Sequence, residues 1–160
     1  MSDFEFDLTT HPNDAYFKAV FAEPERAAAF FQGHLPQAVS ARIDWGSLTP
    51  MPASFVKHSL QQAHSDLLFS ARAGGRELLL YLLFEHQTTV DPTMPLRLLA
   101  YLLDIWQIHE KQHGLPLPPV LPFVLHQGPD KWSVSTDFQD LMDLPEEMAA
   151  ELLPYLPKFS

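Results

Sequence analysis

The sequence contains no cysteine, only 6 glycines and only 10 lysines and arginines among its 160 residues. The absence of cysteine excludes disulfides and thiolate metal sites. No apolar run reaches the ~20 residues that a transmembrane helix needs. The first ten residues, MSDFEFDLTT, are acidic and lack the apolar centre of a signal peptide. We therefore expect a soluble, cytoplasmic protein that makes no membrane contact.

Basic residues are also too few to balance the acids, and the net charge is −10. Residues 1–25 carry six acids and one lysine (−5), residues 130–160 carry seven acids and two lysines (−5), and the segment between them carries seven of each sign. The chain has no stripe of lysine and arginine like that of a high-affinity DNA-binding protein. Any contact with nucleic acid is therefore expected to be weak or to need metal ions that offset the charge.

The length and the 46% hydrophobic content predict one domain over residues 13–160, preceded by an acidic lead-in over residues 1–12. Apolar periodicity and turn residues predict the elements within it. We expect helices over 14–22, 24–35, 96–113 and 144–156, strands over 40–45, 65–72, 77–87 and 120–128, and a loop over 46–53. Gly74 and Gly75 predict a hairpin, Gly114 ends the long helix, and Pro122 places the last strand at an edge. This order predicts an α/β fold with a mixed sheet flanked by helices.

Two carboxylates fall on the predicted hairpin. If the strands pair symmetrically about Gly74-Gly75, the numbers of opposed residues sum to 149, so Asp66 faces Leu83 and Glu85 lies two residues further along the same face. Such a diagonal pair has Cβ atoms roughly 7–8 Å apart, close enough to share a Mg²⁺ or Mn²⁺ ion. The amide of Gln87 could orient a water bound to that ion. Alternatively, Glu85 and Gln87 only mark the emergence of the strand into solvent, and Asp66 caps a turn.

Four segments of the sequence resemble a known family: NDAYFKAVF, SDLLFSA, YLLFEHQTTVDPTMPLRLLAYLLDIW and PPVLPFVLHQG. They are similar, in order, to the Rpn family of recombination-promoting nucleases, also described as transposase-like proteins of the PD-(D/E)XK superfamily. The resemblance implies a restriction-endonuclease-like αβββαβ core and a metal-dependent DNA endonuclease that acts in recombination or transposition. It also implies DNA as the partner and Mg²⁺ or Mn²⁺ as the cofactor.

The same resemblance assigns roles to residues. Asp66 matches the motif aspartate, Glu85 matches the acid of the (D/E)XK signature, and the main-chain carbonyl of His86 would be the third metal ligand. Gln87 stands where the wider superfamily has lysine. Asp14 matches an acid of an N-terminal signature and completes the predicted catalytic set.

Two cations are candidate DNA contacts. Lys18 matches the N-terminal His-Asp-x-x-Phe-Lys signature, in which Asn13 replaces the histidine here. Arg97, at the start of the long helix, could contact phosphate or could instead pair with Asp91 or Asp104. Family members usually continue beyond the last residues of this sequence, so we expect either a truncated chain or a short member. The sequence leaves open whether the chain forms a homo-oligomer.

A competing motif is HExxH, spelled by residues 109–113, which is the signature of zinc metalloproteases. On a helix, His109 and His113 would lie on one face, with Glu110 as general base. The motif occupies the last helical turn, where histidines also suit the helix dipole, and Lys111 lies between the two ligands. A third alternative is a nuclease fold that has lost catalysis and acts as a binding module.

Overall fold

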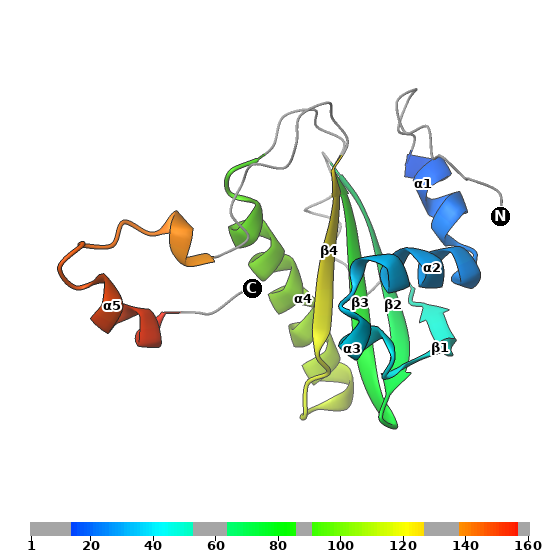
Figure 1. Ribbon diagram of the computed structural model, residues 1–160. Coiled ribbons are helices and arrows are strands. Elements are labelled where there is room, and N and C mark those ends of the chain that lie inside the picture. The colour runs from blue at the N-terminus through cyan, green and yellow to red at the C-terminus, as the bar shows by residue number, and fades with distance from the viewer. Residues whose placement is uncertain (1–13, 53–63, 86–90, 127–137, 157–160) are drawn as a thin grey trace.

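The computed structural model describes residues 14–52, 64–85, 91–126 and 138–156. Its main elements form a mixed sheet with helices on both faces (Figure 1). In chain order they are α1 (Asp14–Phe21), α2 (Pro24–His34), α3 (Gln37–Ser40), β1 (Ile43–Pro50), β2 (His64–Ala73), β3 (Arg76–Glu85), α4 (Met94–His113), β4 (Val120–His126), the 3-10 turn η3 (Phe138–Leu141), α5 (Ala149–Leu152) and the 3-10 turn η4 (Leu153–Tyr155).

The four strands lie in the order β1-β2-β3-β4. The pairs β1–β2 and β2–β3 are antiparallel, and β3–β4 is parallel, with α4 as the crossover between the parallel strands. This is the predicted α/β class, and it is compatible with a PD-(D/E)XK-like core. Pro122 lies in β4, at an edge of this sheet, where a missing N–H breaks no ladder between strands.

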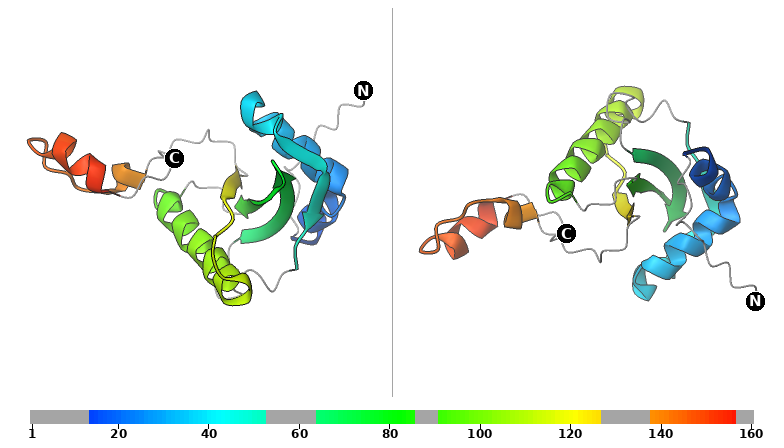
Figure 2. Two further views of the ribbon diagram at one scale, coloured as in Figure 1. Left: turned by 90° about the horizontal axis from the view of Figure 1, so that it is seen from below. Right: turned by 90° about the horizontal axis from the view of Figure 1, so that it is seen from above.

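Strand β3 is buried on both faces because helices cover both sides of the sheet (Figure 2). Its even-numbered residues pack under α1 and α2, in a cluster that includes Phe17, Phe31, Leu80 and Phe84. Its odd-numbered residues pack under α4, in a cluster that includes Leu79, Tyr81, Leu83, Met94, Tyr101 and Leu102. The continuous apolar run of the sequence is therefore explained by burial on two sides.

The β2–β3 hairpin has the predicted turn and register. Gly74 and Gly75 have φ of 58° and 76°, a left-handed backbone that glycine adopts without the steric cost paid by other residues. Every pair from Ala73–Arg76 to His64–Glu85 sums to 149, so Asp66 lies opposite Leu83 as expected.

Two predicted boundaries were wrong. The segment 46–50, expected as a loop, belongs to β1, which begins at Ile43 rather than at residue 40. Gly46 is accommodated because the ladder is interrupted by a bulge between Asp44 and Thr49, and Pro50 is accommodated because β1 is an edge strand.

The predicted helix over 144–156 is also wrong. Only Ala149–Leu152 is α-helical, and it passes into the 3-10 turn Leu153–Tyr155, where Pro154 has no N–H to continue the helix. Among the described residues, no helix is long and apolar enough to cross a membrane.

Candidate active site

Several elements begin or end at one end of the sheet. In the pairing register, Glu85 at the end of β3 lies between His64 at the start of β2 and His126 at the end of β4. The starts of α1 and α4 lie toward the same end (Figure 1). We call this the site end of the sheet. A site at the junction of several element ends can draw ligands from separate parts of the sequence.

Asp66 is the only buried charged residue in the part of the chain that the structure describes, and it is 7% exposed. It lies on β2, on the face that α4 covers, directly opposite Leu83. The hydroxyl of Tyr81 donates a hydrogen bond of 3.0 Å to Oδ2 of Asp66. A buried carboxylate needs such partners because burial without them is costly.

The register places Glu85 on the same face of the hairpin as Asp66. Glu85 follows Leu83 by two residues in β3, and alternate residues of a strand share a face. The side chain of Glu85, and all of His86 and Gln87, lie outside the described residues. The convergence of these groups on one metal ion therefore stays a prediction.

Tyr81 is a residue of the site that sequence analysis missed. Its side chain is fully buried. Burial raises the pKa of Tyr81 far above its ordinary value, and the charge of Asp66 and the hydrogen bond to it add to the rise, so the hydroxyl remains a proton donor. Strand alternation could have identified Tyr81 from the sequence, because Tyr81 precedes Leu83 by two residues and so faces the same side of the sheet as Asp66. A tyrosine within a run of leucines is, however, equally typical of a core residue.

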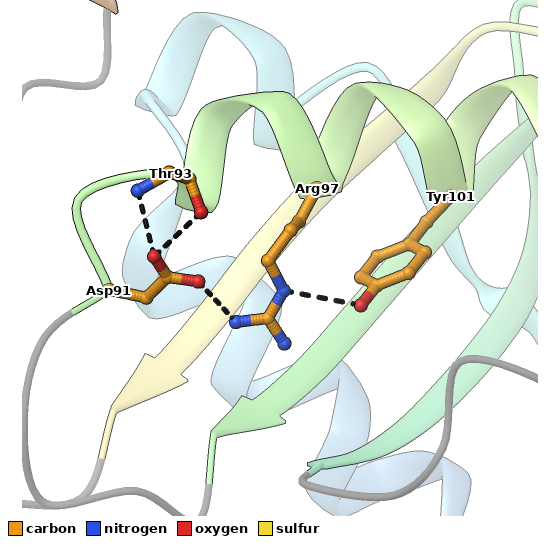
Figure 3. Close-up of polar contacts among 4 residues, drawn as sticks. All are labelled: Asp91, Thr93, Arg97 and Tyr101. Atoms are coloured by element: carbon orange, nitrogen blue, oxygen red, sulfur yellow. Dashed lines mark hydrogen bonds and ion pairs between the residues drawn. The ribbon is translucent and has the colours of Figure 1, made fainter.

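Arg97 lies in the first turns of α4 and is held within a local network (Figure 3). Its Nη1 is 2.6 Å from Oδ2 of Asp91, and its Nε donates a 3.4 Å hydrogen bond to the hydroxyl of Tyr101. Oδ1 of Asp91 accepts hydrogen bonds from the backbone N–H and the hydroxyl of Thr93, the N-cap residue of α4. Of the alternatives left open for Arg97, pairing with Asp91 is observed, and contact with phosphate stays a prediction.

Helix α1 approaches the site end from the opposite face of the sheet. Phe17 stacks on Phe84, the residue next to Glu85, with ring centroids 4.8 Å apart. Asp14 is the first residue of α1, and its side chain lies outside the described residues. Lys18 is exposed on the same helix. The roles predicted for Asp14 and Lys18 are not tested by this geometry.

The HExxH motif lies near the other end of the sheet. His109 and His113 have ring centroids 5.0 Å apart, and Nε2 of His109 is 3.8 Å from Oε1 of Glu77 near the start of β3. Six residues of strand separate Glu77 from Leu83, which is roughly 20 Å. Among the residues that the structure describes, no group of three His, Asp or Glu side chains could hold a metal ion. The geometry therefore supplies these histidines with no third ligand there.

The fold is compatible with a PD-(D/E)XK-like core, and comparison with known proteins identifies the family. Residues 11–159 match the family described as "Putative transposase, YhgA-like". The chain belongs to this family, which includes the recombination-promoting nucleases, as the sequence resemblance predicted. No solved structure matches the chain significantly.

Three relatives from Escherichia coli illustrate the similarity. Recombination-promoting nuclease RpnD of strain O157:H7 is 35% identical over 130 residues, which are 79% of this chain and 50% of that protein. Recombination-promoting nuclease RpnA of strain K12 is 31% identical over 117 residues, 73% of this chain and 40% of that protein. The protein named inactive recombination-promoting nuclease-like protein RpnE, also of K12, is 30% identical over 139 residues, 86% of this chain and 46% of that protein. The chain thus spans half or less of the length of these relatives.

Proposed function

We propose that this chain is a metal-dependent DNA endonuclease domain that hydrolyses phosphodiester bonds during recombination. The observation that carries the proposal is the hairpin register, in which Glu85 lies on the same face as Asp66, which is buried, on neighbouring strands at the site end of the sheet. The relatives named recombination-promoting nucleases support the same reading.

The proposed donor set suits a hard divalent cation. It consists of the carboxylates of Asp66 and Glu85 and the main-chain carbonyl of His86, all oxygen ligands of the kind that Mg²⁺ and Mn²⁺ prefer. Two neighbouring carboxylates repel each other, and a cation between them removes that penalty. When bound, such an ion would supply Lewis-acid activation of a phosphate oxygen and of a water.

The other residues have supporting roles in this proposal. Gln87 has no basic group, and its amide orients the attacking water by hydrogen bonding. Asp14 assists from α1, and Lys18 contacts the DNA backbone. Arg97 already pairs with Asp91 through Nη1, so a phosphate would share the guanidinium with that carboxylate. Since the whole chain carries a charge of −10, we expect DNA binding to be weak without divalent ions.

The test compares plasmid nicking by the wild type and by Asp66→Asn in the presence of Mg²⁺. Asparagine keeps the size of the side chain and an oxygen acceptor for Tyr81, but it loses the negative charge. We expect cleavage to fall by at least about 100-fold, and chelation of the metal to abolish cleavage by the wild type. The control is Asp44→Asn, which makes the same change at an exposed position of β1. Equal nicking by the wild type and Asp66→Asn, with both proteins folded by circular dichroism, would refute the assignment.

A second candidate is a nuclease fold without catalysis that binds DNA. It is favoured by the name of the relative RpnE, which is described as inactive. This alternative predicts that the wild type retards DNA in a gel but never nicks it with Mg²⁺ or Mn²⁺, whatever the enzyme concentration. Cleavage that requires both the metal and Asp66 would exclude it.

A further inference from the structure

Tyr81 and Asp66 form a buried pair across the hairpin. Tyr81 lies opposite Leu68, two residues before the partner of Asp66, and is therefore the diagonal neighbour of Asp66 on the face under α4. Tyr81 is fully buried, Asp66 is 7% exposed, and the hydroxyl lies 3.0 Å from Oδ2. The ring of Tyr81 is held in turn by packing against Tyr101 of α4, with centroids 6.2 Å apart. Such packing leaves the hydroxyl little freedom to move away from the carboxylate.

The chemistry of the donor matters as much as its position. A lysine or arginine in place of Tyr81 would neutralise Asp66 and compete with a metal ion for it. A phenol donates one hydrogen bond and leaves the negative charge of the carboxylate in place. It can therefore fix the orientation of a metal-binding carboxylate without lowering the attraction of the site for a cation. Groups that orient metal ligands in this way typically change metal affinity about 10–100-fold when removed.

We propose that Tyr81 is a positioning residue, whose hydroxyl holds the carboxylate of Asp66 in the orientation that binds the divalent ion. This inference rests on the proposed function, because it assumes that Asp66 is a metal ligand. In this arrangement, a residue that is not itself a ligand controls the affinity of the site for the metal.

Tyr101 provides a matched control in the same buried cluster. It is 4% exposed, and its hydroxyl accepts a hydrogen bond from Arg97 of its own helix. Tyr101→Phe removes one buried phenolic oxygen from the face under α4, as Tyr81→Phe does. The two substitutions differ in that Tyr81→Phe removes the 3.0 Å hydrogen bond from the Tyr81 hydroxyl to Asp66.

The experiment is a calorimetric titration of Mn²⁺ into the wild type, Tyr81→Phe, Tyr101→Phe and Asp66→Asn, without DNA. We expect about 10-fold weaker binding for Tyr81→Phe, less than about 3-fold for Tyr101→Phe, and no measurable binding for Asp66→Asn. Wild-type affinity in a folded Tyr81→Phe protein would overturn the positioning role and leave the proposed metal site intact. Failure of the wild type itself to bind Mn²⁺ would overturn both, so the two failures are distinguishable.

A second measurement does not depend on the folding of Tyr81→Phe. The chain has 4 tyrosines, of which Tyr16 and Tyr155 are exposed, so 3-fluorotyrosine labelling gives two buried ¹⁹F signals. The signal that persists in Tyr101→Phe identifies Tyr81. Mg²⁺ is expected to shift this signal in the wild type and to leave it unchanged in Asp66→Asn. A Tyr81 signal that does not respond to Mg²⁺ in the wild type would contradict the proposal.

Discussion

The geometry of the Asp91–Arg97 pair permits a quantitative prediction of its contribution to stability, and measuring that contribution tests which of two uses Arg97 has (Figure 3). The charged atoms are 2.6 Å apart, and the side chains are only 20% and 25% exposed. Fully exposed ion pairs contribute about 0.2–1 kcal/mol, whereas hydrogen bonds to charged groups that are partly withdrawn from water contribute about 1.5–3 kcal/mol. We expect a coupling free energy of about 1–2 kcal/mol between Asp91 and Arg97.

The assay is a double-mutant cycle on urea unfolding with Asp91→Ala, Arg97→Met and the double variant. Methionine keeps the apolar stem of arginine, so the cycle isolates the charged group. The control cycle uses Glu23, the N-cap residue of α2, and Arg26, whose charged atoms are 2.9 Å apart but whose side chains are 62% and 43% exposed. We expect the control coupling to stay below about 0.5 kcal/mol, as is usual for exposed helical pairs.

The coupling is also expected to depend on pH. Burial raises the pKa of Asp91, but the hydrogen bonds from Thr93 and Arg97 and the charge of Arg97 outweigh it, so the pKa of Asp91 lies below its usual value. The unfolded chain therefore binds a proton at a higher pH than the folded chain does. The stabilisation is complete above the unfolded pKa of about 3.9 and is lost as the pH falls through the lower folded pKa.

Two results would refute this reasoning. One is a coupling at pH 7 no larger than that of the exposed control pair. The other is a coupling that stays constant on acidification from about pH 5 toward pH 2, because the pair cannot persist once Asp91 is protonated. If Arg97→Met instead weakens DNA binding and shows no coupling to Asp91, the primary role of Arg97 is phosphate contact.

Two further predictions concern the hairpin and the packing of α1. Gly75→Ala places a side chain at φ 76° and is expected to lower the free energy of unfolding by about 1–2 kcal/mol. Gly33→Ala lies inside α2 with open space around the added Cβ, and it is expected to raise the free energy of unfolding by about 0.5–1 kcal/mol. Equal effects in urea unfolding would contradict this. Phe84→Ala removes a fully buried ring that stacks on Phe17 and is expected to lower the free energy of unfolding by about 3–5 kcal/mol, against less than about 0.5 kcal/mol for the exposed Tyr16→Ala. A loss below about 1 kcal/mol for Phe84→Ala would show that α1 does not depend on this contact.

The parts of the fold that could be predicted from the sequence are those in which the turn or cap residues and the apolar pattern indicate the same element. Two consecutive glycines between apolar runs admit a two-residue turn, and that turn fixes the register of every pair back to Asp66. The long helix was expected to begin at residue 96 and begins at Met94, but its C-terminal boundary was predicted correctly, because Gly114 adopts φ 72° and its N–H donates to the carbonyl of Glu110. These features depend on neighbours in the sequence, so a single chain suffices to find them.

The parts that were missed depend on neighbours in space. Gly46 and Pro50 are loop residues by composition, yet they lie in β1 because an edge strand tolerates a bulge and a missing N–H. The segment around Ala149–Leu152 has good helix formers but forms only one turn of α-helix. Propensity alone stabilises short helices weakly, so composition could not fix its length.

The candidate site contains one feature that the sequence predicts and one that depends on contacts in space. Period-two alternation places Asp66, Tyr81 and Glu85 on one face, and it does so from residue numbers alone. It cannot say which of the three is buried, because burial depends on α4, which is distant in sequence and covers that face. Once α4 is in place, a tyrosine among leucines must satisfy its hydroxyl, and the carboxylate of Asp66 is the acceptor that the register brings to it. A polar residue inside a run buried on both faces is thus a direct pointer to the polar partner it faces. In this chain that partner is the carboxylate on which the proposed chemistry depends.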